Sequence, residues 1–363
     1  MDFDITADQK MMQESVNRTL ERVAPLDVVR KAGGYAAEVL KALAELGVTG
    51  ILIPEEHGGL GLKLLDAALA AEALGRHVAP VPFVASSVMA PLAVLHAGSE
   101  AQKAKYLPKL ASGELIAGVA VSEQAAGARD KAGITARGGK LNGKSLFVLD
   151  FEGAGIYVVA DKFGALYVVD AAAKGITKTA LSTIDATRAI GELAFDNVEA
   201  EPLAHNPQAA LDRMIDAGRI MLAADTLGAG GRMIEKAVAY AKERKQFGRV
   251  IGSFQAVKHM CAEMIAELEP CRALIWYAAY AFDEFPDQAR RMAAHAKAHT
   301  SEVGTFVART ATEVHGGMGF TDLLGLHYWF KRIGFDRQAL GGPEKVRHDA
   351  AVAQGWIGNQ APS

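Results

Sequence analysis

The sequence of 363 residues has only two cysteines, Cys261 and Cys271, in a stretch with helical spacing. They form neither a disulfide framework nor a metal-ligand pattern, so we expect no metal site and a reducing, cytoplasmic location. The sequence also lacks any apolar run of about 18 residues, which argues against membrane insertion. It has no basic block and its formal net charge is −3, so a nucleic-acid partner is not expected.

What the sequence does contain is typical of a folded protein. Apolar residues make up 50% of the chain and charged residues 22%, which excludes a largely disordered polymer. The length allows two or three domains at about 100–200 residues each. No internal repeat and no low-complexity segment interrupts this composition, so an array of small repeated units is not expected either.

Three segments differ in their apolar pattern. Residues 1–115 have helical spacing broken by glycine and proline, which predicts an N-terminal helical domain. Residues 116–205 contain short β-rich runs about ten residues apart, which predict a small antiparallel sheet or barrel. Residues 206–363 are helical again and predict a C-terminal four-helix bundle. The expected fold is therefore mostly α with a β middle domain.

The C-terminal segment has the clearest periodicity in the sequence. Its apolar residues step by three and four, as in a helix packed inside a bundle. The residues of this seam are Phe254, Val257, Cys261, Met264, Leu268, Cys271 and Ile275. We expect further helices over residues 209–243 and 290–314, and one more after Gly341.

Several residues of the same segment suit a ligand with phosphates and a planar ring. Arg244, at the predicted end of a helix, offers a fixed cation for two hydrogen bonds to a pyrophosphate. Phe247 offers an apolar face, and Gln255 is both a donor and an acceptor. Gly316 and Gly317 lack Cβ atoms, so their backbone amides can approach a ligand closely.

These segments resemble the acyl-CoA dehydrogenase family. The resemblance rests on residues 53–61 (IPEEHGGLG), 119–123 (VAVSE), 244–255 (RKQFGRVIGSFQ) and 313–321 (EVHGGMGFT), which lie in the order of that family. It implies that the chain binds FAD and acts on an acyl-CoA thioester. In such enzymes a carboxylate removes the α-proton while the β-hydrogen leaves as hydride to the flavin. Electron-transfer flavoprotein or a similar acceptor would then take the electrons.

The resemblance also implies that two chains share each flavin. The neighbour-type contacts would come from Arg244, Phe247, Gln255, Gly316 and Gly317, and from Glu313, which stands where the family has glutamine. In the chain that holds the flavin ring, Ser122 would touch the flavin edge. Phe147 stands there in place of the usual tryptophan. We expect a homo- or heterotetramer with a related subunit.

The positions of the catalytic base depart from the family pattern. By resemblance, the base is a glutamate at position 340 or, in some members, at position 218, but this chain has Leu340 and Gly218. Neither side chain takes a proton. Glu344, one helical turn beyond Leu340, is a weak substitute, and Asp216 a weaker one because it faces another side of its helix.

Four interpretations therefore stay open. In the first, the chain is a subunit of a hetero-oligomeric acyl-CoA dehydrogenase whose partner supplies the glutamate, with steroid or fatty-acid catabolism as its setting. Alternatively, it is a self-sufficient homo-oligomeric acyl-CoA dehydrogenase with a displaced base. It could also be a catalytically dead scaffold that binds CoA esters. A related flavin monooxygenase, which needs no α-proton base, is the last alternative.

Overall fold

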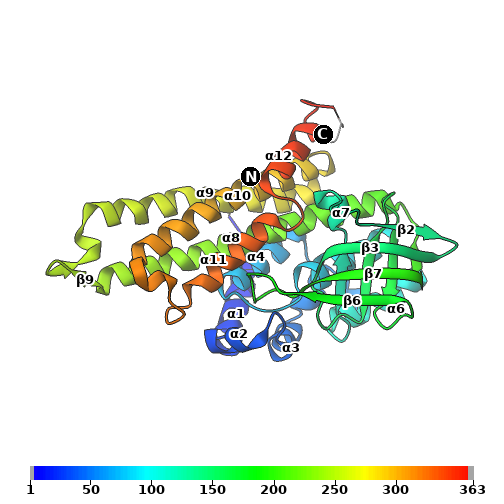
Figure 1. Cartoon of the computed structure of the whole chain (residues 1–363), viewed down its shortest axis with the longest axis horizontal. Helices are drawn as coiled ribbons and strands as arrows, with labels where there is room; N and C mark the ends of the chain where they lie inside the picture. Colours follow the sequence, from blue (N-terminus) through cyan, green and yellow to red (C-terminus); the bar gives the residue numbers. More distant parts are fainter. Residues whose placement is uncertain (1–3, 359–363) are drawn as a thin grey trace.

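The computed structural model describes residues 4–358, and its β-sheet lies towards one end of an elongated molecule (Figure 1). The N-terminal part is helical, as predicted. It contains α1 (Ala7–Val23), α2 (Leu26–Ala32), α3 (Ala37–Glu45), α4 (Leu64–Arg76), the π-helical segment η3 (Val84–Met89), α5 (Ala90–Ala97) and α6 (Glu100–Ala111). The 3-10 helices Val48–Gly50 and Glu55–His57 lie between α3 and α4.

The start of α1 follows from its local sequence. The Gln9 amide donates to Thr6 Oγ1 at 3.2 Å, and the Thr6 amide donates to Gln9 Oε1 at 2.9 Å. This reciprocal capping box satisfies two donors that would otherwise have no partner at a helix N-terminus. Val16 and Leu20 are then buried on the face of α1 that packs on α3 and α4. Local signal and packing therefore agree.

The middle part is one mixed sheet. Its strands are β1 (Ala117–Ala120), β2 (Gly133–Arg137), β3 (Lys140–Leu149), β4 (Ile156–Ala160), β5 (Leu166–Asp170), β6 (Ile176–Leu181), β7 (Ile190–Glu199) and β8 (Glu201–Leu203). Their order is β6-β7-β3-β1-β4-β5-β8, with β2 paired to β3. The predicted antiparallel pairing holds for the other strand pairs of this sheet, but β1 and β4 run parallel. The chain between them is long enough for the crossover that parallel strands need.

The C-terminal part consists of long helices. They are α8 (Pro207–Glu243), α9 (Gln255–Glu284), α10 (Pro286–His315), α11 (Leu326–Gln338) and α12 (Pro343–Ala353), with the short hairpin β9 (Lys245–Gln246) and β10 (Arg249–Val250) after α8. The structure confirms the predicted seam of α9 from Met264 to Ile275, where the seam residues are buried. The earlier seam residues are only partly buried, because this end of α9 projects beyond the bundle. The sequence did not predict α11.

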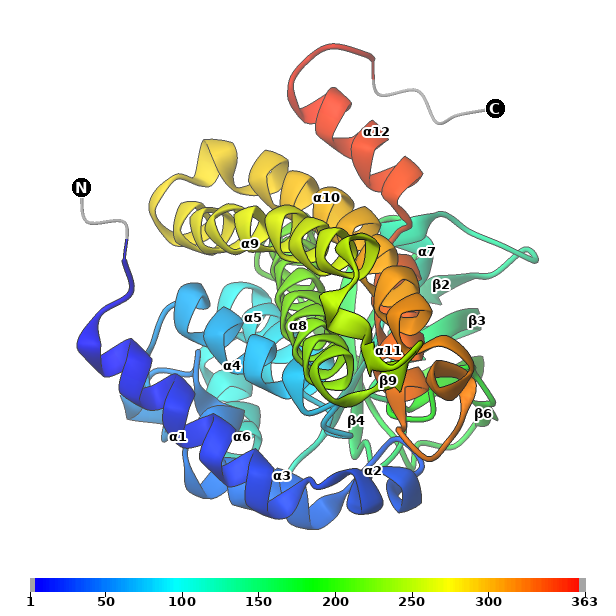
Figure 2. The same cartoon turned by 90° about the vertical axis from the view of Figure 1, so that its left-hand side faces the viewer.

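Helix α8 is the central element of the molecule. Seen end-on, it lies between α4 and α5 on one side and α9 and α10 on the other (Figure 2). The backbones of α4 and α8 approach so closely that a Cβ on Gly75 would lie 1.9 Å from the Asp225 carbonyl oxygen. A Cβ on Gly228 would lie 1.8 Å from the Glu72 carbonyl oxygen. Glycine at both positions therefore allows the N-terminal helices to dock on the bundle.

Two predictions concern the chain as a whole. Among the helices of residues 4–358, none is long and apolar enough to cross a membrane. The division into domains at residues 115 and 205 stays a prediction. The chain changes from helices to strands between Ala111 and Ala117, and from strands to helices between Leu203 and Pro207.

Candidate active site

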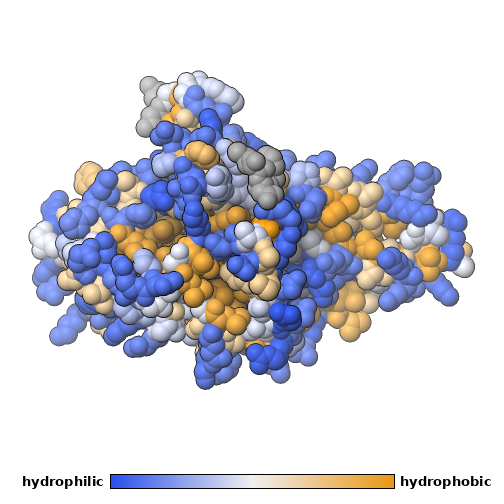
Figure 3. Space-filling model, turned by 180° about the vertical axis from the view of Figure 1, so that it is seen from behind, coloured by the Kyte–Doolittle hydropathy of each residue, from blue (hydrophilic) through white to orange (hydrophobic). Residues whose placement is uncertain are grey.

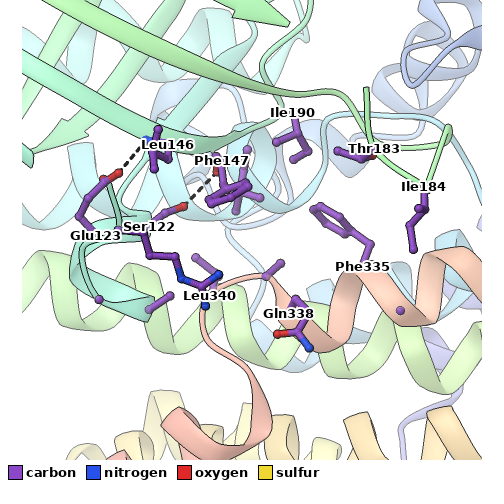
Figure 4. A pocket seen from close by; sticks show the side chains of 16 residues that line it. Ser122, Glu123, Leu146, Phe147, Thr183, Ile184, Ile190, Phe335, Gln338 and Leu340 are labelled. Atoms are coloured by element: carbon purple, nitrogen blue, oxygen red, sulfur yellow. Dashed lines mark hydrogen bonds between the residues drawn. The ribbon is translucent and has the colours of Figure 1, made fainter. Parts of the chain in front are cut away.

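A cavity of about 350 Å³ lies where the sheet meets the C-terminal end of α11 (Figure 4). The short helix α7 (Ser122–Ala126), strand β3, the start of β7 and the segment after α11 contribute its walls. Most of its lining is apolar, including Phe147, Leu149 and Ile190, while Ser122 and Arg129 add a hydroxyl and a cation. Such a cavity suits a planar ring that carries a few hydrogen-bonding atoms and an anionic tail.

Ser122 and Phe147, the two residues expected at a flavin ring, lie together in this cavity. The Ser122 hydroxyl donates to the Phe147 carbonyl oxygen at 3.0 Å (Figure 4). Phe147 has a φ of 52° and the residue is 46% exposed. A positive φ is strained for a residue with a Cβ, and it persists only where surrounding contacts hold it. Here it bends β3 and presents the Phe147 ring towards the cavity.

Glu123 also lines the cavity, but its carboxylate is occupied. Oε2 accepts a hydrogen bond from the Ser145 hydroxyl at 2.7 Å, and Oε1 accepts one from the Leu146 amide at 2.6 Å. These bonds fasten α7 to β3. A general base must be free to reach a substrate proton, and Glu123 already stabilises the wall of the cavity.

The two positions expected for a catalytic base, Leu340 and Gly218, face one another in space. Leu340 lines the cavity and is 3% exposed. Gly218, on α8, is so close that a Cβ built on it would lie 2.6 Å from Leu340 Cδ1. Although the two residues are far apart in the sequence, a carboxylate at either position would enter one volume. This chain has none at either.

The two substitutes considered from the sequence lie elsewhere. The Glu344 side chain is 76% exposed, forms an ion pair with Arg337 at 3.5 Å, and does not line the cavity. Asp216 is buried on α8, where desolvation raises its pKa to about 6. That pKa would suit a base, but Asp216 is not part of the cavity lining either. The structure therefore gives neither residue access to a substrate in this cavity.

Two buried cations hold the segment that carries Leu340. Arg219 Nε donates to the Leu340 carbonyl oxygen at 3.0 Å, and Arg219 Nη2 donates to the Ala125 carbonyl oxygen at 3.2 Å. Lys297 Nζ donates to the carbonyl oxygens of Arg337 at 3.0 Å and Gly341 at 3.4 Å. Burial lowers the pKa of Lys297 to about 7. The sequence analysis missed Lys297, whose only signal is a lone cation among the alanines of α10.

The predicted neighbour-type contacts form a second group at the far end of the bundle. Arg244 ends α8, Gln255 begins α9, Glu313 lies near the end of α10, and Gly316 and Gly317 follow it. All are exposed, as is Phe247 in the hairpin, at 90%. The hairpin and the sheet lie at opposite ends of the molecule (Figure 1). One chain therefore does not bring these residues to its own cavity.

The fold and the apolar cavity beside the sheet define a class of helix–sheet–helix flavoproteins. Family models described as the N-terminal and C-terminal domains of acyl-CoA dehydrogenase match residues 6–114 and 208–354. The chain belongs to the acyl-CoA dehydrogenase family. It is an FAD-dependent oxidoreductase of that family, whose shared function is flavin-dependent acyl-CoA dehydrogenation.

Individual relatives align with this chain over nearly its full length. The acyl-CoA dehydrogenase IpdE2 of Mycobacterium tuberculosis is 31% identical over 93% of this chain and 95% of its own. A structure of the steroid ACAD Tcur3481-Tcur3483 is 28% identical, with a TM-score of 0.85 over 96% of this chain and 98% of its own. Glutaryl-coenzyme A dehydrogenase is 25% identical, with a TM-score of 0.89 over 98% and 97%.

Proposed function

We propose that the chain is the subunit without a catalytic base in a hetero-oligomeric acyl-CoA dehydrogenase, and that its partner supplies the glutamate. The observation that carries this proposal is the adjacency of Leu340 and Gly218 at the cavity. Both base positions lie there, and neither has a carboxylate. Glu123 is the one carboxylate among the lining residues of the described chain, and both its oxygens accept hydrogen bonds within the wall.

The exposed group at the hairpin supports a flavin shared between chains. The hairpin that follows Arg244 and contains Phe247 lies at the end of the molecule opposite the sheet (Figure 1), and Phe247 is almost fully exposed. A cation and an aromatic face suit the diphosphate and a ring of FAD bound mainly by a partner. Apolar side chains also gather on the face seen in Figure 3, the kind of surface that oligomers bury. We propose a heterotetramer.

A second cavity supports a CoA thioester as the substrate. It has a volume of about 320 Å³, and its lining includes the cations Arg219, Arg290 and Lys345 and one carboxylate, Asp349, which pairs with Arg219 and Lys345. Helix α7 lines both cavities, with Gln124 and Ala125 at the second one. Arg219 Nη1 is buried there without a hydrogen-bond partner among the described residues. A polar ligand arm that passes behind α7 would find donors in this cavity.

The residues of this chain would hold the flavin in place rather than move a proton. FAD, when bound, supplies the acceptor for the hydride that leaves the β-carbon of the acyl group. Ser122 and Phe147 would touch its ring, while Arg219 and Lys297 fix the backbone beside it. The solved structure named as a steroid ACAD favours a bulky CoA thioester. Electron-transfer flavoprotein or a similar carrier is the proposed acceptor.

The test is the flavin content of the protein purified alone and purified with a co-expressed homologue that carries the glutamate. We expect the lone chain to hold little FAD and to be inactive, and the complex to hold FAD that an acyl-CoA bleaches without oxygen. Full FAD occupancy and turnover by the lone chain would overturn the proposal. It would point instead to a self-sufficient dehydrogenase.

A further inference from the structure

The volume between the two base positions is filled by side chains of this chain. A Cβ built on Gly218 would lie 2.6 Å from Leu340 Cδ1 and 2.8 Å from Met89 Sδ. Leu340 is 3% exposed and Met89 is fully buried. Three segments, namely α8, the end of η3 and the segment after α11, therefore meet without room for another group.

The backbone conformation at position 340 is not set by the leucine side chain. Leu340 has a φ of 56°, in the left-handed region that a side chain with a Cβ disfavours. Arg219 donates a hydrogen bond to the Leu340 carbonyl oxygen, and Lys297 donates one to that of Gly341. Both cations are 1% exposed. These contacts hold the segment in place, and the Leu340 side chain is thereby directed towards Gly218, beside which Met89 also lies.

We propose that Leu340 and Met89 plug the acyl space of this chain, so that its own cavity excludes the acyl group of a CoA thioester. The inference rests on the proposed function, because the reacting carbons of an acyl group must lie beside the base. Both base positions border the volume that Leu340 and Met89 occupy. The chain is then unable to hold a substrate productively even with a flavin present. All acyl binding in the hetero-oligomer would take place at the partner's cavity.

The plug predicts how the lone chain discriminates between ligands. With FAD in excess, calorimetry would compare butyryl-CoA with CoA itself for the wild type and for Leu340→Ala. We expect the wild type to bind both equally, since the acyl group finds no space. Leu340→Ala should bind butyryl-CoA at least about tenfold more tightly than CoA, because a few buried methylene groups are worth that much.

A matched control separates the plug from general loosening. Leu326 is fully buried at the other end of α11 and does not line the cavity. Leu326→Ala removes the same atoms, and we expect it to leave the ratio of the two affinities at the wild-type value. A wild-type chain that already prefers butyryl-CoA as strongly as Leu340→Ala does would overturn the proposal.

A second measurement tests the packing without any ligand. In the wild type, Gly218→Ala places a Cβ against Leu340 and Met89, and we expect the Tm to fall by a few degrees. In the Leu340→Ala background the same substitution should cost much less. Equal losses in both backgrounds would refute the plug. If coupling is seen but no variant binds CoA, butyryl-CoA or FAD, the proposed function fails instead, and the acyl-exclusion inference with it.

Discussion

Arg332 and Asp225 form a two-bond ion pair in the interior, with 2.9 Å from Nε to Oδ1 and 2.8 Å from Nη2 to Oδ2. Arg188 Nη2 donates to the same carboxylate at 2.9 Å. Burial alone would raise the pKa of Asp225, but the two guanidinium groups outweigh it and hold this pKa below its usual value. The pair joins α8 to α11, and so places the helix whose C-terminal end reaches the cavity.

Replacing Arg332 by methionine should therefore be severe. The substitution leaves the Asp225 carboxylate buried with one guanidinium fewer. We expect the free energy of unfolding, measured in urea, to fall by about 3–5 kcal/mol. Arg337→Met is the control, because its ion pair with Glu302 at 2.9 Å is partly exposed. That change should cost no more than about 1 kcal/mol. Similar losses from both substitutions would contradict the central role of the Arg332 pair.

Lys297 should make stability depend on pH in a defined direction. Burial lowers its pKa to about 7, whereas an unfolded lysine has a pKa of about 10.4. Between these values the unfolded chain binds the extra proton, so the contribution of Lys297 to stability rises with pH and is lowest below pH 7. Relative to Lys297→Met, the unfolding free energy of the wild type should increase by up to about 1.4 kcal/mol per pH unit.

The measurement is urea unfolding of both proteins at intervals from pH 6.5 to roughly pH 9.5, a range set by the two pKa values. Lys258 is exposed on α9, so Lys258→Met is a suitable control that should run parallel to the wild type. A constant difference between the wild type and Lys297→Met over the whole range would show that Lys297 is not buried as described.

Two glycines of α8 should respond in opposite ways to alanine. Gly228→Ala places a Cβ 1.8 Å from the Glu72 carbonyl oxygen, so α4 must move away from α8. We expect a loss of more than about 3 kcal/mol, or no folded protein. Gly231 lies on the same helix, and a Cβ there meets no atom within 4 Å. Gly231→Ala should raise stability by about 0.5–1 kcal/mol, because alanine is the better helix former. The measurement is the Tm of each variant relative to the wild type, which should fall for Gly228→Ala and rise for Gly231→Ala.

The elements that sequence could predict are those with a visible period. The seam of α9 repeats every three to four residues, and the β-rich runs are separated by glycine turns. Helix α11 was missed because its buried face includes Arg332 and Asp336, which hide the apolar spacing. The parallel pairing of β1 with β4 depends on contacts between distant segments, and no local signal encodes it.

For the site, the resemblance could name expected base positions but not how they lie in space. It assigned the base to Gly218 and Leu340, and that assignment stays a prediction. Their proximity to one another, with Met89 also beside Gly218, follows only from the docking of α8, η3 and α11. Likewise, nothing in the sequence distinguishes Lys297 from a surface lysine. Only the structure shows that it is buried and donates to the Gly341 carbonyl oxygen.

The hairpin end of the bundle gives the last prediction, which concerns the shared flavin. Arg244 is exposed at the end of α8, where a partner's FAD diphosphate would accept its hydrogen bonds. In the co-expressed complex, Arg244→Gln should lower FAD affinity by about tenfold or more, since a hydrogen bond to a charged group is worth about 1.5–3 kcal/mol. Lys242→Gln removes a nearby exposed charge from the same helix and should change FAD affinity less than about twofold. Flavin absorbance after equilibrium dialysis gives both values. Equal effects would mean that only the general positive field of this end matters, and that Arg244 makes no direct contact with the cofactor.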